Sequence, residues 1–315
     1  MSDTPSSHDS GPDGPDAFFD PVPSGHKSGY VALIGKPNVG KSTLMNALLG
    51  RKLSIVTRKP QTTRQRVIGI ASAPEHQIIF LDTPGIIKPR YGLHDAMMGQ
   101  VTSAIRDADL LLFLHDATKP EPDTFSLKHA GDQPAVLVLT KMDLLSSEEA
   151  LPLVEKYQAH RGFEEIVPTS ALKGENLDTL MRLIVERLPE GPPFYPKEMV
   201  SEHPERFFVA EIVREKVFQQ YHEEIPYSVQ VNIVEYKERP EGEKDFIDAE
   251  IVVTRKAHKG ILIGKGGRAL KKLGMAARHD IEDFVQSPVY LQLHVKVREN
   301  WRDRESYLRS YGYRS

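Results

Sequence analysis

The chain contains no cysteine and no long hydrophobic run among its 315 residues. Without cysteine it has neither a disulfide framework nor a Cys-ligated zinc or iron–sulfur site. No segment reaches the run of about 18 apolar residues that a membrane-spanning helix needs, and the acidic, polar N-terminus does not resemble a secretory signal. We therefore expect a cytoplasmic protein without membrane-spanning helices.

A large net charge is also missing, because 41 Lys and Arg residues oppose 44 Asp and Glu residues, giving a formal net charge of -3. This balance excludes a positive field over the whole chain that would attract nucleic acid, although it allows a local basic patch. The length is sufficient for about two domains, each with its own core.

Composition divides the chain into four parts. The first part, residues 1–28, is rich in Ser, Asp, Gly and Pro, and a segment of this composition buries too little apolar surface to offset the entropy cost of ordering its backbone. Four prolines between positions 189 and 196 interrupt any helix and indicate a stiff linker. The predicted parts are a disordered tail (1–28), a first domain (29–188), a linker (189–203) and a second domain (204–315) that ends in a helix at 301–313.

Short apolar runs alternate with helical patterns in the first domain. The runs that we interpret as strands are 30–34, 77–81, 110–114, 135–139 and 166–167. This rhythm is typical of an α/β domain whose mostly parallel sheet carries helices on both faces.

The second domain has a different pattern. A helical pattern at 207–221 precedes three runs in which apolar and polar residues alternate, at 229–233, 247–253 and 289–297. Alternation with a period of two predicts strands with one buried face. We therefore expect an α+β domain with a small sheet.

A glycine-rich loop follows the first predicted strand and precedes a helical pattern, which is the context of a phosphate-binding loop. Its residues are Gly35, Lys36, Pro37, Asn38, Val39, Gly40, Lys41 and Ser42, and Thr43 opens the helix. Backbone N–H groups would bind phosphate oxygens, Lys41 would bind the β- and γ-phosphates, and Ser42 would ligate Mg²⁺. The alternative is a plain glycine turn.

A second segment at the end of a predicted strand fits the same chemistry. It consists of Asp82, Thr83, Pro84 and Gly85. Asp82 would hold Mg²⁺ through water, and the Gly85 N–H would sense the γ-phosphate. Upstream, Thr62 and Thr63 offer hydroxyls to the metal when the third phosphate is present, and we favour Thr63.

Two further segments predict that the base is guanine. They are Thr140, Lys141, Met142 and Asp143, after the strand at 135–139, and Ser170 and Ala171, after 166–167. The Asp143 carboxylate would accept both guanine N1–H and N2–H₂, a pair that adenine does not offer. Lys141 would lay its aliphatic stem over the purine, and a backbone N–H at Ser170 or Ala171 would reach guanine O6.

The second domain contains a strongly basic stretch without acidic residues. Between positions 251 and 279 its basic residues are Arg255, Lys256, Lys259, Lys265, Arg268, Lys271, Lys272 and Arg278. The G-x-x-G loop at its centre consists of Gly264, Lys265, Gly266 and Gly267. KH domains use such a loop between two helices to hold about four nucleotides of single-stranded RNA. Bases would rest on Ile261, Ile263 and the strand at 247–253; the alternative is a solvated basic helix with a glycine turn.

On these motifs the chain resembles the Era family of GTPases, from residue 29 to residue 312. The resemblance implies a P-loop GTPase domain followed by a type II KH domain, with GTP or GDP and Mg²⁺ as ligands. It also implies binding to the 3′ end of small-subunit ribosomal RNA during assembly of the ribosomal subunit, and peripheral contact with the inner face of the cell membrane in some members. We expect a monomer.

Two positions depart from familiar GTPases. The family usually has Asn in place of Thr140, an amide that contacts the purine and braces the phosphate loop, so its loss would weaken nucleotide affinity. Ile86 follows Gly85 where Ras-like proteins carry a glutamine that orients water. We therefore predict slow intrinsic turnover, with charge stabilised by Mg²⁺, Lys41 and backbone donors.

Asn38 has two interpretations. In similar GTPases an asparagine at this loop position helps to hold a potassium ion, whereas a turn-forming Asn after Pro37 is the equal alternative. The candidate catalytic residues are thus Lys41, Asn38, Thr63 and Gly85.

Two rival functions share some of these features. A metabolic phosphotransferase would use the same phosphate loop, but it would not need the guanine segments. A non-enzymatic RNA scaffold would explain Thr140 and Ile86, but it would not need an intact Lys41. We favour a nucleotide-gated RNA chaperone in which GTP and Mg²⁺ order the loops at Thr63 and Gly85 and change the RNA affinity of the KH domain.

Overall fold

The computed structural model describes residues 23–160, 163, 165–240 and 242–314. Of the tail predicted at 1–28, residues 1–22 lie outside the described residues. Lys27 and Ser28 belong to the first strand, where they pair with His76 and Gln77, so the predicted tail extends too far toward the first domain. The polar composition of this strand start is misleading, because Ser28 is buried at the domain edge.

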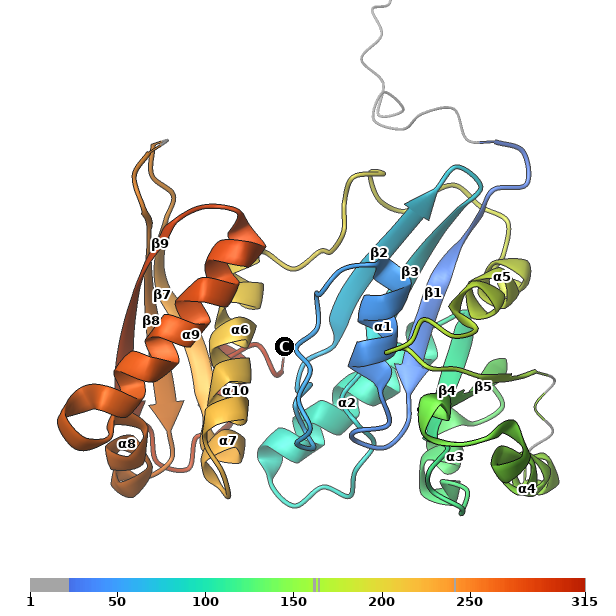
Figure 1. Cartoon of the computed structure of the whole chain (residues 1–315), viewed down its shortest axis with the longest axis horizontal. Helices are drawn as coiled ribbons and strands as arrows, with labels where there is room; N and C mark the ends of the chain where they lie inside the picture. The colour runs from blue at the N-terminus through green and yellow to red at the C-terminus, as the bar shows by residue number, and fades with distance from the viewer. Residues whose placement is uncertain (1–22, 161–162, 164, 241, 315) are drawn as a thin grey trace, which may run out of the picture.

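The first domain is built on a mostly parallel sheet (Figure 1). Among the described residues it has six strands in the order β2-β3-β1-β4-β5-β6, and β2 is antiparallel to β3. The strands are β1 (Lys27–Ile34), β2 (Val67–Ala73), β3 (His76–Asp82), β4 (Leu110–Asp116), β5 (Ala135–Thr140) and β6 (Ile166–Pro168). The predicted α/β class is therefore confirmed.

Helices cover both faces of this sheet. They are α1 (Lys41–Leu49), α2 (Gly92–Asp107), α3 (Thr124–Ala130), α4 (Ser147–His160) and α5 (Leu177–Arg187). Alternate residues of β1 enter different cores: Val31 and Leu33 pack with α1 and α5, whereas Ala32 and Ile34 pack with α2, α3 and α4. A strand buried on both faces reads as a continuous apolar run, which is why the sequence revealed it.

The sequence prediction missed β2. Gly69 lies in the middle of this edge strand, and an interior glycine weakens a strand pattern. A Cβ at Gly69 would lie 2.5 Å from Leu49 Cδ1, so the Leu49 side chain at the end of α1 packs directly over this glycine.

The connection between the domains lies against the first sheet. The Gln77 side chain accepts hydrogen bonds from the backbone N–H of Phe194 and Tyr195, at 2.7 and 2.9 Å. The Ile70 N–H donates to the Val200 carbonyl at 2.9 Å. The segment predicted as a stiff linker is thus also fixed by hydrogen bonds along β2 and β3.

The second domain has a three-stranded sheet, counted over the described residues, in the order β7-β8-β9. Strand β7 is antiparallel to β8, and β9 is parallel to β8. Its elements are α6 (Glu205–Gln220), α7 (Ile225–Ser228), β7 (Gln230–Lys237), β8 (Asp245–Val253), α8 (Lys256–Ile263), α9 (Arg268–Val285), β9 (Val289–Val297) and α10 (Glu305–Ser310). Helices α6 and α9 pack on one face of this sheet, and the predicted α+β class is confirmed.

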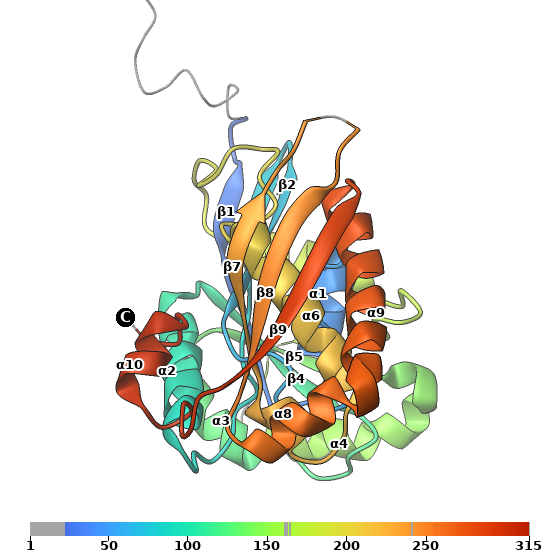
Figure 2. The ribbon, with the colours of Figure 1, turned by 90° about the vertical axis from the view of Figure 1, so that its left-hand side faces the viewer.

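The C-terminal segment joins the domains. Helix α10 spans only Glu305–Ser310, so the helix predicted at 301–313 is too long at both ends. Trp301 is fully buried, and its indole N–H donates to the Ser228 carbonyl at 2.9 Å. Trp301 shares an apolar cluster with Leu93 and Met97 of α2, and Figure 2 shows α10 beside α2. In the described part of the chain, no helix is long and apolar enough to cross a bilayer.

Candidate nucleotide and RNA sites

A pocket of about 540 Å³ lies at the carboxyl ends of the parallel strands, and we call it the P-loop pocket. Sites in open α/β sheets form at this edge because the loops after the strands converge there. Its lining residues are Pro37, Asn38, Gly40, Lys41, Ser42, Thr43, Ile55, Val56, Thr57, Arg58, Gln61, Thr62, Thr63, Gly85, Thr140, Lys141, Asp143, Leu144, Ala171 and Leu172. Segments predicted from distant parts of the sequence therefore meet in one cavity.

Lys41 lies at the centre of the glycine-rich loop. Its ammonium donates to the carbonyls of Lys36 and Gly35, at 2.9 and 3.2 Å. Burial lowers the pKa of Lys41 to about 8, although the nearby carboxylates of Asp82 and Asp123 oppose this change. An anion placed in the loop would favour the charged ammonium.

Glycines allow two loops to approach each other. The Ile86 N–H donates to the Gly35 carbonyl at 3.0 Å. A Cβ at Gly85 would lie 2.5 Å from the Pro37 nitrogen, so this position admits only glycine. Gly85 thus lies directly against the phosphate-binding loop.

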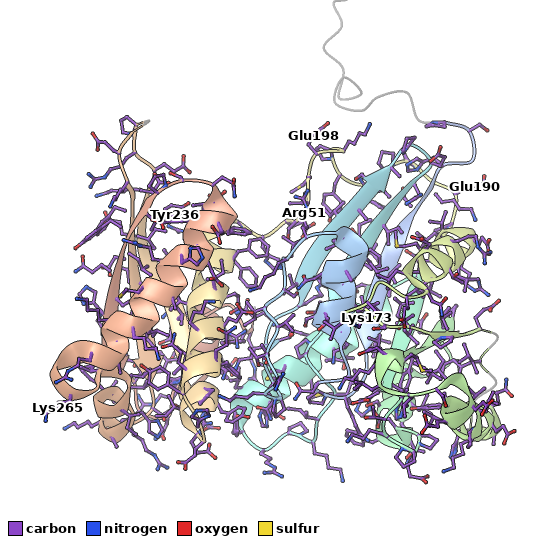
Figure 3. All side chains as sticks on the ribbon, viewed as in Figure 1. Arg51, Lys173, Glu190, Glu198, Tyr236 and Lys265 are labelled. Atoms are coloured by element: carbon purple, nitrogen blue, oxygen red, sulfur yellow. The ribbon has the colours of Figure 1, made fainter. Side chains whose placement is uncertain are left out.

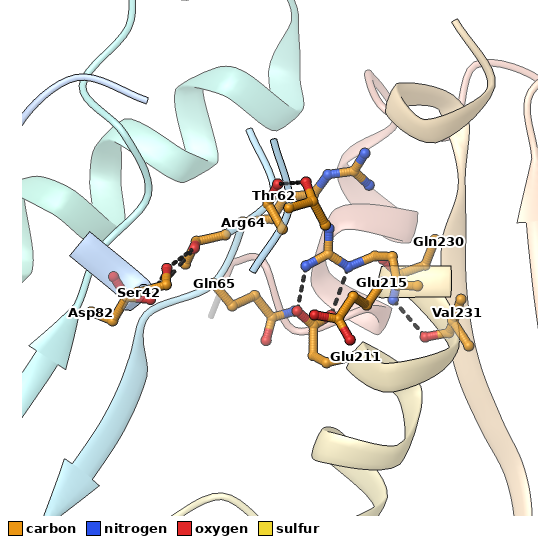
Figure 4. A network of polar contacts seen from close by, with 12 residues as sticks. Ser42, Thr62, Arg64, Gln65, Asp82, Glu211, Glu215, Gln230 and Val231 are labelled. Carbon is orange, nitrogen blue, oxygen red and sulfur yellow. Dashed lines mark hydrogen bonds and ion pairs between the residues drawn. The ribbon is translucent and has the colours of Figure 1, made fainter. Parts of the chain in front are cut away.

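Three oxygen atoms form a cluster at the base of α1. The Ser42 hydroxyl lies 2.6 Å from Asp82 Oδ2 and 2.9 Å from the Thr63 hydroxyl. The Thr62 hydroxyl instead bonds to the Thr57 hydroxyl at 2.6 Å, so the structure places Thr63 rather than Thr62 beside Ser42. Figure 4 shows Ser42 and Asp82 together, with Arg64 leading from this cluster toward the second domain.

The cluster fits a hard divalent cation. Asp82 is fully buried, and its Oδ1 has no hydrogen-bond partner within the described residues. Burial raises the pKa of Asp82, while Ser42 and Lys41 act in the opposite direction. Mg²⁺ prefers hydroxyl, carboxylate and water oxygens, so a cation beside Ser42, Thr63 and Asp82 would offset the cost of this buried carboxylate.

Thr140 braces the phosphate-binding loop, contrary to the expectation that the brace is lost without Asn. Its hydroxyl lies 2.6 Å from the Val39 carbonyl and 3.0 Å from the His115 carbonyl. The hydroxyl replaces the bracing amide because Thr140 is buried directly beneath the loop, close to Gly40. An asparagine at this position would also contact the purine through its amide, and the Thr140 hydroxyl does not replace that contact.

Side chains at the other end of the pocket are already oriented. Asp143 accepts a hydrogen bond from the Ser170 hydroxyl at 2.6 Å. The Lys141 ammonium pairs with Asp116 at 2.6 Å, which fixes its aliphatic stem along the pocket wall. The Ser170 N–H donates to the Glu175 carbonyl, so Ala171 is the better candidate for the backbone donor.

Several predicted residues support the pocket from behind rather than line it. The Thr83 hydroxyl donates to the Leu33 carbonyl at 2.6 Å, and Lys36 pairs with Asp123 at 3.1 Å. Ile86 is only 2 % exposed and packs in the apolar core, so its side chain does not enter the pocket. The remaining residues outside the lining are Gly35, Val39, Asp82, Pro84, Met142 and Ser170.

Residues 51–66, which we call the switch segment, form one wall of the pocket. The Asn38 amide donates to the Arg58 carbonyl at 2.8 Å, so the phosphate-binding loop and this segment touch. The sequence analysis did not assign Ile55, Arg58 or Gln61, because nothing in their local pattern distinguishes them from other loop residues. Leu172 is 78 % exposed at the opposite wall, which the sequence does not reveal because a leucine beside Ala171 looks like an ordinary core residue.

The G-x-x-G loop joins α8 to α9 through a short turn, η3 (Lys265–Gly267). Gly264, Gly266 and Gly267 have φ values of 68°, 61° and 77°, a region that favours glycine. Figure 3 shows Lys265 at the outer end of the second domain, directed away from the first. The predicted basic residues are all exposed: Arg255, Lys256, Lys259, Lys265, Arg268, Lys271, Lys272 and Arg278.

The floor of the predicted RNA groove needs correction. Ile247, Ala249, Ile251 and Val253 are fully buried in the domain core, because this face of β8 packs against α6 and α9, and they cannot contact bases. The hollow beside the G-x-x-G loop, about 520 Å³ in volume, lies between α9 and β9 instead. It is lined by Gly267, Leu270, Lys271, Gly274, Met275, Arg278, Tyr290, Leu291 and Leu293.

The α9–β9 hollow offers surfaces for bases. Met275 and Tyr290 are 64 % and 57 % exposed, and an exposed tyrosine ring can stack on a base. Ile261 is 54 % exposed and Ile263 is half-buried, so both remain accessible at the end of α8. The sequence showed that large apolar side chains lie close to basic ones in this domain, but it did not show that the strand lining the hollow is β9.

Comparisons with known proteins match both domains. The family described as 50S ribosome-binding GTPase matches residues 30–141, and the KH domain family matches residues 224–302. GTPase ERA1, chloroplastic, from Zea mays is 52% identical over 295 residues, covering 91% of this chain and 71% of that protein. GTPase ERA-like, chloroplastic, from Arabidopsis thaliana is 50% identical, covering 91% and 69%.

Solved structures give the same result. A crystal structure of an Aquifex aeolicus Era variant bound to GDP and AlF4⁻ has a TM-score of 0.87 and 43% identity, covering 92% of this chain and 100% of that chain. A crystal structure of Era in complex with MgGDPNP and nucleotides 1506–1542 of 16S ribosomal RNA has a TM-score of 0.88 and 42% identity, with the same coverage. The chain belongs to the Era family, with a P-loop GTPase domain followed by a KH domain.

Proposed function

We propose that this protein is a GTP-gated switch that binds the 3′ end of small-subunit ribosomal RNA and acts in assembly of the small ribosomal subunit. The P-loop pocket binds GTP and hydrolyses it to GDP and phosphate. The KH domain binds RNA. The related Era complex with MgGDPNP and a 16S ribosomal RNA segment supports both parts of this proposal.

The nucleotide lies with its phosphates over the glycine-rich loop and its base between the walls formed by Lys141 and Leu172. Asp143 accepts the two guanine N–H groups, and the Ala171 N–H donates to guanine O6. Lys41 binds the β- and γ-phosphates. Ser42, Thr63 and Asp82 would hold Mg²⁺, which supplies positive charge to the phosphate oxygens.

Hydrolysis is slow in the isolated protein. Ile86 stands after Gly85, where Ras-like proteins carry the glutamine that orients the attacking water, and its side chain faces the core. Positioning of the water therefore depends on backbone donors such as the Gly85 N–H. Asn38 helps to hold a potassium ion beside the phosphates through its amide oxygen, because its amide nitrogen donates to the Arg58 carbonyl at 2.8 Å. Turnover that is equal in sodium and potassium at one ionic strength would contradict the potassium role.

RNA binds along the G-x-x-G loop and the α9–β9 hollow. Lys265 and Arg268 neutralise phosphates that approach the glycines, and Tyr290 offers its ring to a base. The same electrostatic contact makes RNA affinity decrease with salt. We further propose that the protein is a monomer that acts in the cytoplasm, with any membrane contact peripheral.

One observation carries the proposal that the two activities are coupled. The switch segment contributes Thr63 to the candidate magnesium cluster, and the side chain of the next residue, Arg64, contacts the second domain. Arg64 is buried and donates to the carbonyls of Val229 and Pro226, at 2.5 and 2.9 Å. The Lys59 ammonium is hydrogen-bonded to carbonyls at the C-terminal end of α6. A change in this segment when the γ-phosphate leaves therefore alters how the KH domain is held.

The test is a measurement of guanine nucleotide affinity and phosphate release on the purified chain in potassium. Each is measured with and without an oligonucleotide that matches the ribosomal RNA 3′ end. We expect release of free phosphate from GTP, faster with the RNA, and loss of both turnover and nucleotide binding in a Lys41→Ala control. Tight RNA binding with no turnover and no dependence on nucleotide would leave only a scaffold.

A further inference from the structure

A buried carboxylate of the KH domain points into the GTPase domain. Glu215 lies on α6 and is 1 % exposed. Its Oε1 accepts the Val56 N–H at 2.9 Å, and its Oε2 accepts from the Lys52 ammonium at 2.6 Å. Both partners belong to the switch segment. Figure 4 places Glu215 where the two domains meet, on the far side of Arg64 from Ser42.

Such a carboxylate is costly unless it is paired, so its position indicates that the pairing matters. The start of the switch segment is held by the GTPase domain itself, because Asn46 Oδ1 accepts the N–H groups of Leu53 and Ser54, at 3.0 and 2.9 Å. Two residues further on, at Val56, the backbone is held by Glu215. The segment backbone is thus hydrogen-bonded to the GTPase domain up to Ser54 and to the KH domain at Val56, a few residues before Thr63.

The surrounding interface does not fix the segment by packing alone. A cavity of about 710 Å³ lies between the domains, next to Leu53, Ile55, Phe208 and Ile212. Side chains that line a cavity lack contacts on one side, so they hold their neighbours less firmly than a close-packed core does. Hydrogen bonds therefore position this side of the segment: the two bonds to Glu215 at its start, and those of Lys59 and Arg64 further along.

We propose that Glu215 is a positioning residue for GTP hydrolysis, which the KH domain supplies to the GTPase domain. By holding the Val56 backbone, it keeps the Thr63 hydroxyl beside Ser42 and Asp82, the residues that would hold Mg²⁺. This inference rests on the proposed GTPase function and gives it a further part. Because coupling is reciprocal, whatever moves α6 also changes the geometry of the switch segment.

The experiment compares three variants of the full-length chain with the wild type. Glu215→Ala removes both bonds, whereas Glu215→Gln keeps an oxygen that can accept from Val56. Glu205→Ala is the matched control, because Glu205 lies on the same helix and accepts from Tyr236 within the KH domain, at 3.1 Å. The measurements are kcat for GTP hydrolysis, the Mg²⁺ concentration at half-maximal rate, GDP affinity, and folding by circular dichroism.

We expect Glu215→Ala to lower kcat about tenfold, the effect of losing a charge-assisted hydrogen bond. It raises the Mg²⁺ requirement and leaves GDP affinity unchanged, because the phosphate-binding loop is intact. Glu215→Gln has a kcat and a Mg²⁺ requirement between those of Glu215→Ala and the wild type, and Glu205→Ala has the wild-type values. A general structural role would lower GDP affinity and kcat together.

Wild-type kcat and Mg²⁺ requirement in Glu215→Ala would overturn the inference alone, since GTPase activity would remain. Equal loss of GDP affinity and kcat would overturn it as well. If Glu215→Ala does not fold, Glu215→Gln decides by the same criteria. Absence of phosphate release by the wild-type chain would instead overturn the proposed function together with this inference.

Discussion

Replacement of Thr140 by Val tests how the phosphate-binding loop is held in place. The Thr140 hydroxyl lies 2.6 Å from the Val39 carbonyl, and Thr140 is only 4 % exposed. Valine has nearly the same shape but no hydroxyl, so the carbonyl is left buried without this donor. The loss of one buried hydrogen bond costs about 1–2 kcal/mol.

That cost appears as nucleotide affinity, because the loop must be held in its binding geometry to receive phosphate. A loss of ~1.4 kcal/mol corresponds to a tenfold weaker GDP complex. The assay is titration of a fluorescent GDP analogue into Thr140→Val, with Thr102→Val as the matched control. Thr102 is an exposed residue of α2 whose hydroxyl donates to the Met98 carbonyl at 3.0 Å.

The expected order is clear. Thr140→Val binds GDP about tenfold more weakly, and Thr102→Val binds like the wild type. An affinity of Thr140→Val within about twofold of the wild type, in a fully folded protein, would refute the role of the hydroxyl as a loop brace.

Three further predictions follow from single side chains. The pKa of Lys41, lowered by burial to about 8, rises when phosphate binds, so GDP affinity decreases above pH 8 by up to about tenfold per pH unit; titrations at pH 7, 8 and 9 check this, and a flat profile would contradict it. Ile86→Gln places an amide in the apolar core and lowers the free energy of unfolding by about 1–3 kcal/mol without raising turnover; urea unfolding and phosphate release measure both, and a large rise in turnover would disprove the assignment. Lys265→Glu reverses a charge at the G-x-x-G loop and weakens RNA binding about tenfold or more while GDP affinity is unchanged; equal RNA affinity would exclude this loop as the contact.

The sequence predicted those elements whose pattern lies within a short stretch of the chain. The strands after which the nucleotide segments lie were found because a strand buried on both faces is a continuous apolar run, as at 110–114. The glycine-rich loop was found because its spacing is a geometric requirement for phosphate binding. Each of these two signals is contained within a few consecutive residues, so it is visible without a structure.

Contacts between distant segments were not predictable in the same way. In the sequence Glu215 looks like any helical glutamate, and only the docking of α6 against the switch segment reveals its role. The floor of the RNA groove was wrong because the apolar face that alternation identified in 247–253 is the face that packs against α6 and α9, which sequence alternation does not reveal. The brace at Thr140 depends on one hydroxyl and one carbonyl, 101 positions apart in the sequence.

The most direct test of the account is the affinity of the full-length chain for the ribosomal RNA 3′-end oligonucleotide in two nucleotide states. We predict that the dissociation constants with a GTP analogue and with GDP differ by about fivefold or more, the scale of a coupling of ~1 kcal/mol. We predict that Arg64→Ala reduces this difference, because Arg64 links the switch segment to the KH domain. Equal RNA affinity in the two states of the wild-type chain would contradict a nucleotide-gated RNA switch.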